Sequence, residues 1–197
     1  MNSLILIVLL VINLGISYWN ARVCGKVWND AKALGGWLKL VVWSGAIQSA
    51  VGFSSVLLAI LGYGAHVAGY LPAKAAHGML SLWYLLVIIP VLMSGWIITV
   101  QSWISLARDR SLMNMASTGW NTYASISNTV DAFTSIGGAV KGVKNLFSEV
   151  DDDSSAPGLA IVVAAVGLVL CSVFGGALLT ACIIQANKGT LPAPVKN

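Results

Sequence analysis

Four long apolar segments dominate the pattern of hydrophobic and polar positions along the chain. They cover residues 3–19, 40–61, 80–104 and 159–184, and none of them contains a charged side chain. Even the shortest would reach roughly 25 Å as an α-helix, which is the short end of what crosses a bilayer core of about 30 Å. The pattern therefore predicts four transmembrane helices.

The first apolar segment also has the length of a secretory signal peptide. However, no basic residue precedes its apolar run, and no cleavage site of the A-x-A type precedes Asn20. We therefore interpret residues 3–19 as a retained membrane helix.

The segment 20–34, which follows the first span, has amphipathic helical periodicity. Apolar side chains recur every three or four residues at Val23, Val27, Ala31 and Leu34, and Arg22, Lys26 and Asn29 occupy another face. This pattern predicts a helix on the inner leaflet, ended by Gly35-Gly36. The alternative is an ordinary connecting helix without a partner.

The segment 111–148 carries the longest periodic pattern outside the predicted spans. Its apolar residues follow one another at steps of three or four, which predicts one continuous helical face. We call the central seven the apolar stripe: Trp120, Tyr123, Ile126, Val130, Phe133, Ile136 and Val140, with Ala116, Val143 and Phe147 at its ends. Gly137-Gly138 is expected to bend or divide the helix.

The apolar stripe needs a partner, and three kinds are conceivable: the inner leaflet, the same helix of a neighbouring subunit, or a separate cytoplasmic protein. A helix on a membrane surface usually carries lysine and arginine on its polar face, and this one has few before Lys141. The composition thus favours contact with protein, and the stripe residues are the predicted partner-binding residues.

Basic residues in the connections predict the orientation of the spans. The connections 19–39 and 105–157 hold eight lysines and arginines, whereas the 62–79 loop and the C-terminal tail hold three. Cytoplasmic loops carry the excess of positive charge, so the first two connections are expected in the cytoplasm and both termini outside. Tryptophans near the span ends fit the interfacial aromatic belt.

The composition agrees with lipid as the main solvent of the chain. Of the 197 residues, 57% are hydrophobic and only 9% are charged, against roughly a quarter charged in soluble domains. The mean hydropathy is +0.83. The net charge of +4 comes without a basic cluster, which excludes nucleic acid as an expected partner.

Motifs for catalysis, cofactors or metals are missing from the sequence. No catalytic or phosphate-binding signature occurs, and the spans hold no ionisable acid, base or histidine of the kind that marks a proton or ion pathway. His66 and His77 lack nearby cysteine or carboxylate ligands, and Asp151–Asp153 lacks the glycine and distal glutamate of a calcium loop. We expect no enzyme, no cofactor and no metal site.

Small residues at four-residue spacing mark faces on which membrane helices pack closely. They occur in the second and fourth spans, and the predicted packing residues are Gly45, Ser49, Ala50, Gly167, Cys171, Gly175 and Gly176. Such ridges serve packing within one bundle or between subunits. Gln48 and Gln101 are expected to find hydrogen-bond partners in or near the spans.

The chain is thus expected to be an all-α, polytopic membrane protein forming one domain over residues 1–197. The favoured function is a non-enzymatic scaffold or anchor that forms homo-oligomers in a bacterial cytoplasmic membrane and binds a cytoplasmic partner. A secretion, conjugation or anti-phage complex of the envelope would be a fitting context. The alternative is a small homo-oligomeric channel, and an enzyme or coupled transporter ranks third.

Overall fold

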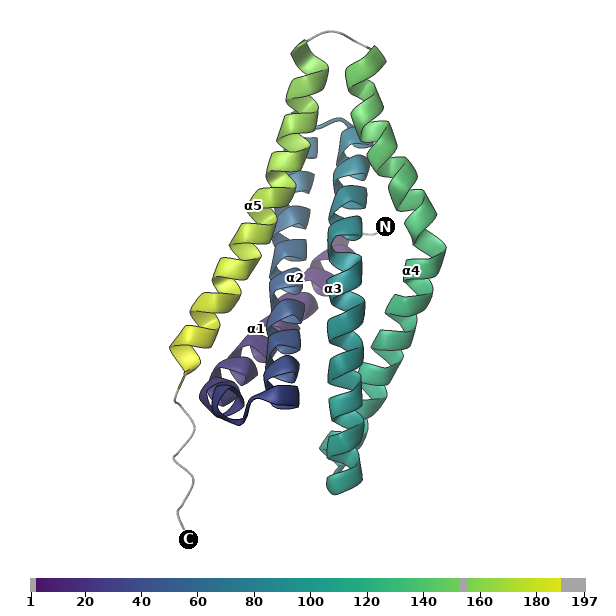
Figure 1. Cartoon of the computed structure of the whole chain (residues 1–197). Helices are drawn as coiled ribbons and strands as arrows, with labels where there is room; N and C mark the ends of the chain where they lie inside the picture. Colours follow the sequence, from purple (N-terminus) through teal and green to yellow (C-terminus); the bar gives the residue numbers. More distant parts are fainter. Residues whose placement is uncertain (1–2, 153–155, 189–197) are drawn as a thin grey trace.

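A computed structural model describes residues 3–152 and 156–188, and within these ranges it contains five α-helices and no strand (Figure 1). The helices are α1 (Ser3–Leu34), α2 (Gly36–Val67), α3 (Ala73–Arg108), α4 (Leu112–Asp152) and α5 (Ala156–Asn187). The predicted all-α fold is confirmed. Four helices, all except α4, are long and apolar enough to cross a membrane, in agreement with the predicted number.

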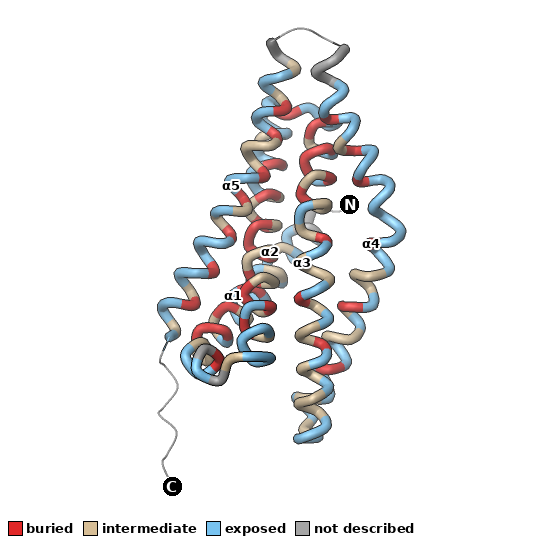
Figure 2. The backbone as a smooth tube through the Cα atoms, in the orientation of Figure 1, coloured by how far each residue is buried: buried red, intermediate tan, exposed pale blue. Residues whose placement is uncertain are grey.

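Helix α2 is the centre of the bundle. It packs against α1, α3 and α5, whereas α4 packs chiefly along α3 (Figure 1). In the apolar stretch of α2, 44% of the residues are buried, compared with 17–22% in the other three apolar helices. Figure 2 shows that the outer sides of α4 and α5 are largely exposed. A large part of the apolar surface is therefore on the outside, which supports a multi-pass membrane protein.

Two apolar clusters hold the bundle together at different levels. One joins α2, α3, α4 and α5 and includes Leu58, Met79, Leu146 and Val169. The other joins α1, α2 and α5 and includes Ala21 and Phe53.

Helix α1 is one uninterrupted helix, although the sequence suggested a membrane span that ends at Trp19 and a separate helix that begins at Asn20. Backbone hydrogen bonds do not depend on side-chain hydropathy, so the helix continues through the change in composition. Its second half packs closely on α5, since a Cβ added at Gly25 would lie 2.7 Å from the carbonyl oxygen of Ile184.

The turn between α1 and α2 follows the prediction. Gly35 and Gly36 have φ values of +63° and +55°, a conformation that side chains other than glycine rarely adopt. The amide of Gly35 donates to the carbonyl oxygen of Ala31 at 3.0 Å. One glycine therefore separates two helices of 32 residues each.

The connection between α2 and α3 is shorter than the predicted 62–79 loop. It covers only residues 68–72, because α2 extends to Val67 and α3 starts at Ala73. Both histidines consequently lie on helices, and the Nδ1 atom of His66 lies 2.8 Å from the carbonyl oxygen of Leu71.

Helix α4 runs antiparallel to α3 and beside it, rather than apart from the apolar helices (Figure 1). It is continuous over 41 residues and bends near its middle, so the glycine pair does not divide it (Figure 1). Residues 133–138 are all exposed between the buried Ala132 and Ala139, which places the outward part of the bend there. The C-terminal end of α4 meets the end of the bundle that holds the α2–α3 loop.

Candidate functional site

Over residues 118–129 the face of α4 that packs on α3 is polar, whereas the apolar Leu146 packs on α3 farther along the helix. The Thr99 hydroxyl, which is buried, donates to the carbonyl oxygen of Asn121 at 3.0 Å and lies 2.8 Å from the Ser125 hydroxyl. At one end the Thr118 hydroxyl donates to the carbonyl oxygen of Ser102 at 3.0 Å. We call this contact the α3–α4 polar seam.

Two tryptophans of α3 extend the polar seam. Trp103 donates its indole N–H to the Thr122 hydroxyl, and Trp96 donates to the Thr129 hydroxyl, both at 3.1 Å. Trp96 lies deep in the apolar segment 80–104, away from the segment ends where tryptophans meet the membrane interface. The structure gives it a hydrogen-bond partner on α4.

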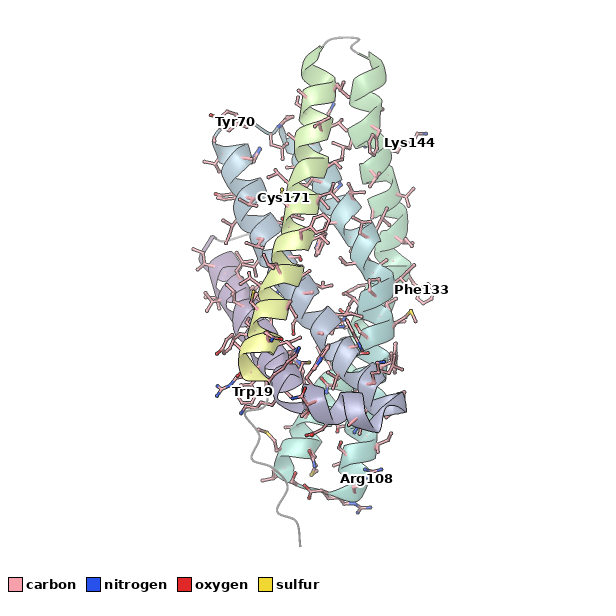
Figure 3. The ribbon with its side chains drawn as sticks, turned by 60° about the vertical axis from the view of Figure 1, so that its left-hand side comes forward. Trp19, Tyr70, Arg108, Phe133, Lys144 and Cys171 are labelled. Atoms are coloured by element: carbon pink, nitrogen blue, oxygen red, sulfur yellow. The ribbon has the colours of Figure 1, made fainter. Side chains whose placement is uncertain are left out.

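The apolar stripe is exposed at all seven positions and lies on the side of α4 away from the seam, except that Trp120 also lines a cleft between the helices. Phe133 is 82% exposed, Tyr123 66% and Trp120 61%. Figure 3 shows Phe133 at the edge of the molecule, directed away from the other helices. The structure thus leaves the whole predicted partner-binding surface free, and whether it binds a partner stays a prediction.

The predicted packing residues divide into an inner and an outer group. A Cβ at Gly176 would lie 2.6 Å from the carbonyl oxygen of Ala50, and a Cβ at Gly175 would lie 2.9 Å from Leu57, so both glycines serve the contact between α5 and α2. A Cβ at Gly45 would lie 2.7 Å from the Cys24 sulfur of α1.

Ser49 belongs to the inner group, since it is fully buried and donates to the carbonyl oxygen of Gly45 at 2.9 Å. Gly167 and Cys171 form the outer group. No atom lies within 4 Å of a Cβ at Gly167, and Cys171 is exposed.

A cleft of about 560 Å³, lined by apolar as well as polar side chains, lies among α1, α2, α3 and α4. Its lining includes hydroxyl and amide side chains from all four helices, among them Asn20, Gln48, Gln101, Asn121 and Asn128, and none of the lining residues is charged. The hydrophobic periodicity did not indicate this cleft, because its residues come from four segments far apart in the sequence.

Both predicted polar span residues have hydrogen-bond partners beside the cleft. Gln48 donates its side-chain amide to the carbonyl oxygen of Val91 at 3.0 Å and to the Ser94 hydroxyl at 2.7 Å, which joins α2 to α3. Gln101 accepts the indole N–H of Trp37 at 2.7 Å. The cleft is therefore bordered by contacts that hold its helices in place.

Within the described residues, no group of three or more histidine, cysteine, aspartate or glutamate side chains comes together as a metal site. No protein-family model matches the chain, and the comparisons with curated proteins and with solved structures give no match either.

Proposed function

We propose that the chain is a non-enzymatic, multi-pass membrane scaffold subunit that associates with further copies of itself in a bacterial cytoplasmic membrane and binds a partner at the membrane surface. The observation that carries this proposal is the distribution of polarity. Hydroxyl and amide side chains face one another between the helices, whereas large apolar side chains cover the outside of α1, α4 and α5. Lipid and neighbouring membrane helices are the surroundings in which such an exterior is stable.

The outer face of α5 is the proposed contact between copies. Gly167 and Cys171 leave a shallow surface between the exposed Val163, Phe174 and Leu178. Small residues allow membrane helices to approach closely, and the larger neighbours add van der Waals contact. The other ridge of α5, at Gly176, is already occupied by α2.

The partner is proposed at the end of the bundle where α1 turns into α2 and α3 turns into α4. This end carries Arg22, Lys26, Lys39, Arg108 and Arg110, and the last three are exposed. We place a soluble partner at this end rather than at the apolar stripe, because α4 packs chiefly on the apolar helix α3. An acidic surface of a cytoplasmic protein would complement the basic end.

The test is the mass of the protein purified in mild detergent, with identification of every polypeptide that co-purifies. We expect a homo-oligomer that Gly167→Phe dissociates and that the matched control Gly64→Phe preserves, since a Cβ at Gly64 also meets nothing within 4 Å. The double variant Arg108→Glu, Arg110→Glu should release the partner without changing the oligomer. A monomer that co-purifies with nothing would refute the scaffold proposal.

A small channel is the second candidate, and the uncharged polar side chains of the cleft favour it. Uncharged hydroxyl and amide groups in the lining of the cleft fit a weakly selective path for water or small polar solutes. Conductance or solute flux in liposomes tests it, with Asn128→Leu expected to lower the flux and Asn145→Leu, on an exposed part of α4, to leave it unchanged. Liposomes that remain tight at every potential would remove this candidate.

A further inference from the structure

Helix α4 has the polarity of a helix surrounded by hydrocarbon, although its mean hydropathy is too low to mark it as a membrane span. In water a helix buries its apolar face and exposes its polar face. Here Thr118 and Ser125 are buried against α3, while Tyr123 and Phe133 point outward. The seam takes up several of the polar groups that lower the hydropathy of α4, and large apolar side chains make up much of the surface that α4 offers to its surroundings.

The length and position of α4 fit a full crossing. Contacts with α3 extend from Thr118 at one end to Leu146, which lies against Gly78, at the other. This stretch reaches roughly 40 Å at about 1.5 Å per residue, more than the hydrocarbon core of about 30 Å. Since α3 is itself long and apolar enough to span, α4 lies at the same depth over the same distance.

The charges on α4 fit the same placement. Between Leu112 and Val140 the only charged residue is Asp131, and lysines appear only from position 141 onward. Asp131 is exposed, and it follows the cleft-lining residues Asn128 and Ala124 by three and seven positions, so it lies on the flank of α4 that borders the cleft. Its carboxyl group is therefore on a different side of the helix from Val130 and Phe133.

From these observations we infer that α4 crosses the bilayer as a fifth membrane helix, with the apolar stripe from Tyr123 to Val140 in contact with lipid acyl chains. The inference rests on the membrane placement in the proposed function and adds a crossing to it. Residues 148–152 then lie on the same side of the membrane as the α2–α3 loop and opposite the α3–α4 turn. Figure 3 shows the labelled Tyr70 and Lys144 toward one end of the molecule and Arg108 toward the other.

Basic residues agree with five crossings as well as with four. With α4 crossing, the side with the α1–α2 turn, the α3–α4 turn and the C-terminal tail holds eight lysines and arginines, and the other side holds Lys74, Lys141 and Lys144. The same end of the bundle is cytoplasmic in both topologies. The topology with five crossings differs from the one with four in two ways: the C-terminal tail is cytoplasmic, and the acidic residues Glu149–Asp153 are outside.

The test is the labelling of single cysteines in a variant whose three native cysteines are replaced by serine. The reporters replace exposed residues near the ends of helices: Tyr70→Cys, Leu112→Cys and Ser148→Cys. A membrane-impermeant maleimide is applied to intact cells and then to permeabilised cells. We expect Ser148→Cys to react together with Tyr70→Cys in intact cells, and Leu112→Cys to react only after permeabilisation.

Other labelling patterns separate the two proposals. If Ser148→Cys behaves like Leu112→Cys while Tyr70→Cys differs, α4 does not cross, and only the present inference fails. If Tyr70→Cys and Leu112→Cys react on the same side, α3 does not cross either, and the membrane placement in the proposed function fails with it.

A nitroxide attached at Phe133→Cys identifies what covers the stripe in liposomes. Lipid contact predicts strong relaxation by oxygen and little by a water-soluble nickel chelate. Strong relaxation by the chelate would overturn the inference by placing the stripe in water. Shielding from both agents, or spin–spin broadening between labels, would overturn the lipid contact in favour of a protein partner or a second copy.

Discussion

Adding one methyl group at Gly176 should weaken the contact between α2 and α5, whereas the same change at Gly167 should not. A Cβ at Gly176 would lie 2.6 Å from both the carbonyl oxygen of Ala50 and the amide nitrogen of Ser54, and ordinary contacts begin at 3.4 Å. The Ser54 hydroxyl also lies in the way and can rotate, but these two obstacles are backbone atoms that no side-chain rotation moves. The two helices would have to move apart by roughly 0.8 Å, the difference between these distances.

The magnitude follows from two opposing contributions. Overpacking of a close contact costs about 1–3 kcal/mol, and replacing glycine by alanine within a helix gains about 1 kcal/mol. We expect Gly176→Ala to lower the free energy of unfolding by about 1–2 kcal/mol, because rigid backbone obstacles favour the upper part of the cost. A Cβ at Gly167 meets no atom within 4 Å, so Gly167→Ala should raise the free energy of unfolding by up to about 1 kcal/mol.

The assay is reversible unfolding in mixed micelles with increasing SDS, followed by tryptophan fluorescence and far-ultraviolet circular dichroism. Alanine is itself a small residue, so a contact between copies at Gly167 would tolerate it. The decisive quantity is the difference between the two variants in the free energy of unfolding, which is obtained from the midpoint and slope of the SDS unfolding transition. Equal stability changes for Gly176→Ala and Gly167→Ala would refute the close α2–α5 contact.

Three further perturbations test other contacts. Thr99→Val should lower the free energy of unfolding by about 1–3 kcal/mol because it leaves buried α4 groups without their partner. The control is Thr134→Val, whose wild-type hydroxyl bonds only within α4 and whose loss should change the free energy of unfolding by less than about 0.5 kcal/mol. Similar effects of the two variants would contradict the polar seam. Gln48→Leu removes both bonds to α3 and should cost about 1–2 kcal/mol in the same unfolding assay, and an unchanged midpoint would argue against this link. A small maleimide should modify the exposed Cys182 in detergent and spare the buried Cys24 until SDS unfolds the protein, so early modification of Cys24 would contradict the packing of α1 on α2.

The apolar helices could be predicted from sequence because a bilayer demands long runs without charge, and such runs are visible residue by residue. The helix ends could not, since backbone hydrogen bonding continues past the apolar run. Asn20 and Arg22 therefore continue α1, and Gly62 and His66 remain in α2 instead of a loop. The starts at residues 3 and 112 and the turn at Gly35 and Gly36 were accurate to within one residue, and the turn has a local cause because a positive φ has a local sequence requirement.

The apolar stripe was also visible in sequence, but its surroundings were not. Periodicity shows that Tyr123 and Phe133 share a face, and it does not show whether that face points to protein, water or lipid. The polar seam depends on Thr99 meeting Ser125, two residues of different helices whose register is set by packing. Likewise, nothing in the spacing of α5 distinguishes the inner Gly176 from the outer Gly167.

The three-residue turn between α3 and α4 has a consequence for how the protein is made. If α4 enters the membrane, several of its hydroxyl and amide groups lack partners outside the helix until α3 is beside it, because α3 supplies those partners. The connection of residues 109–111 is too short to let α3 and α4 move far apart during synthesis. Helix α4 would therefore leave the translocation machinery as the second arm of a hairpin, and its insertion would depend on the residues of α3 more than on its own hydrophobicity.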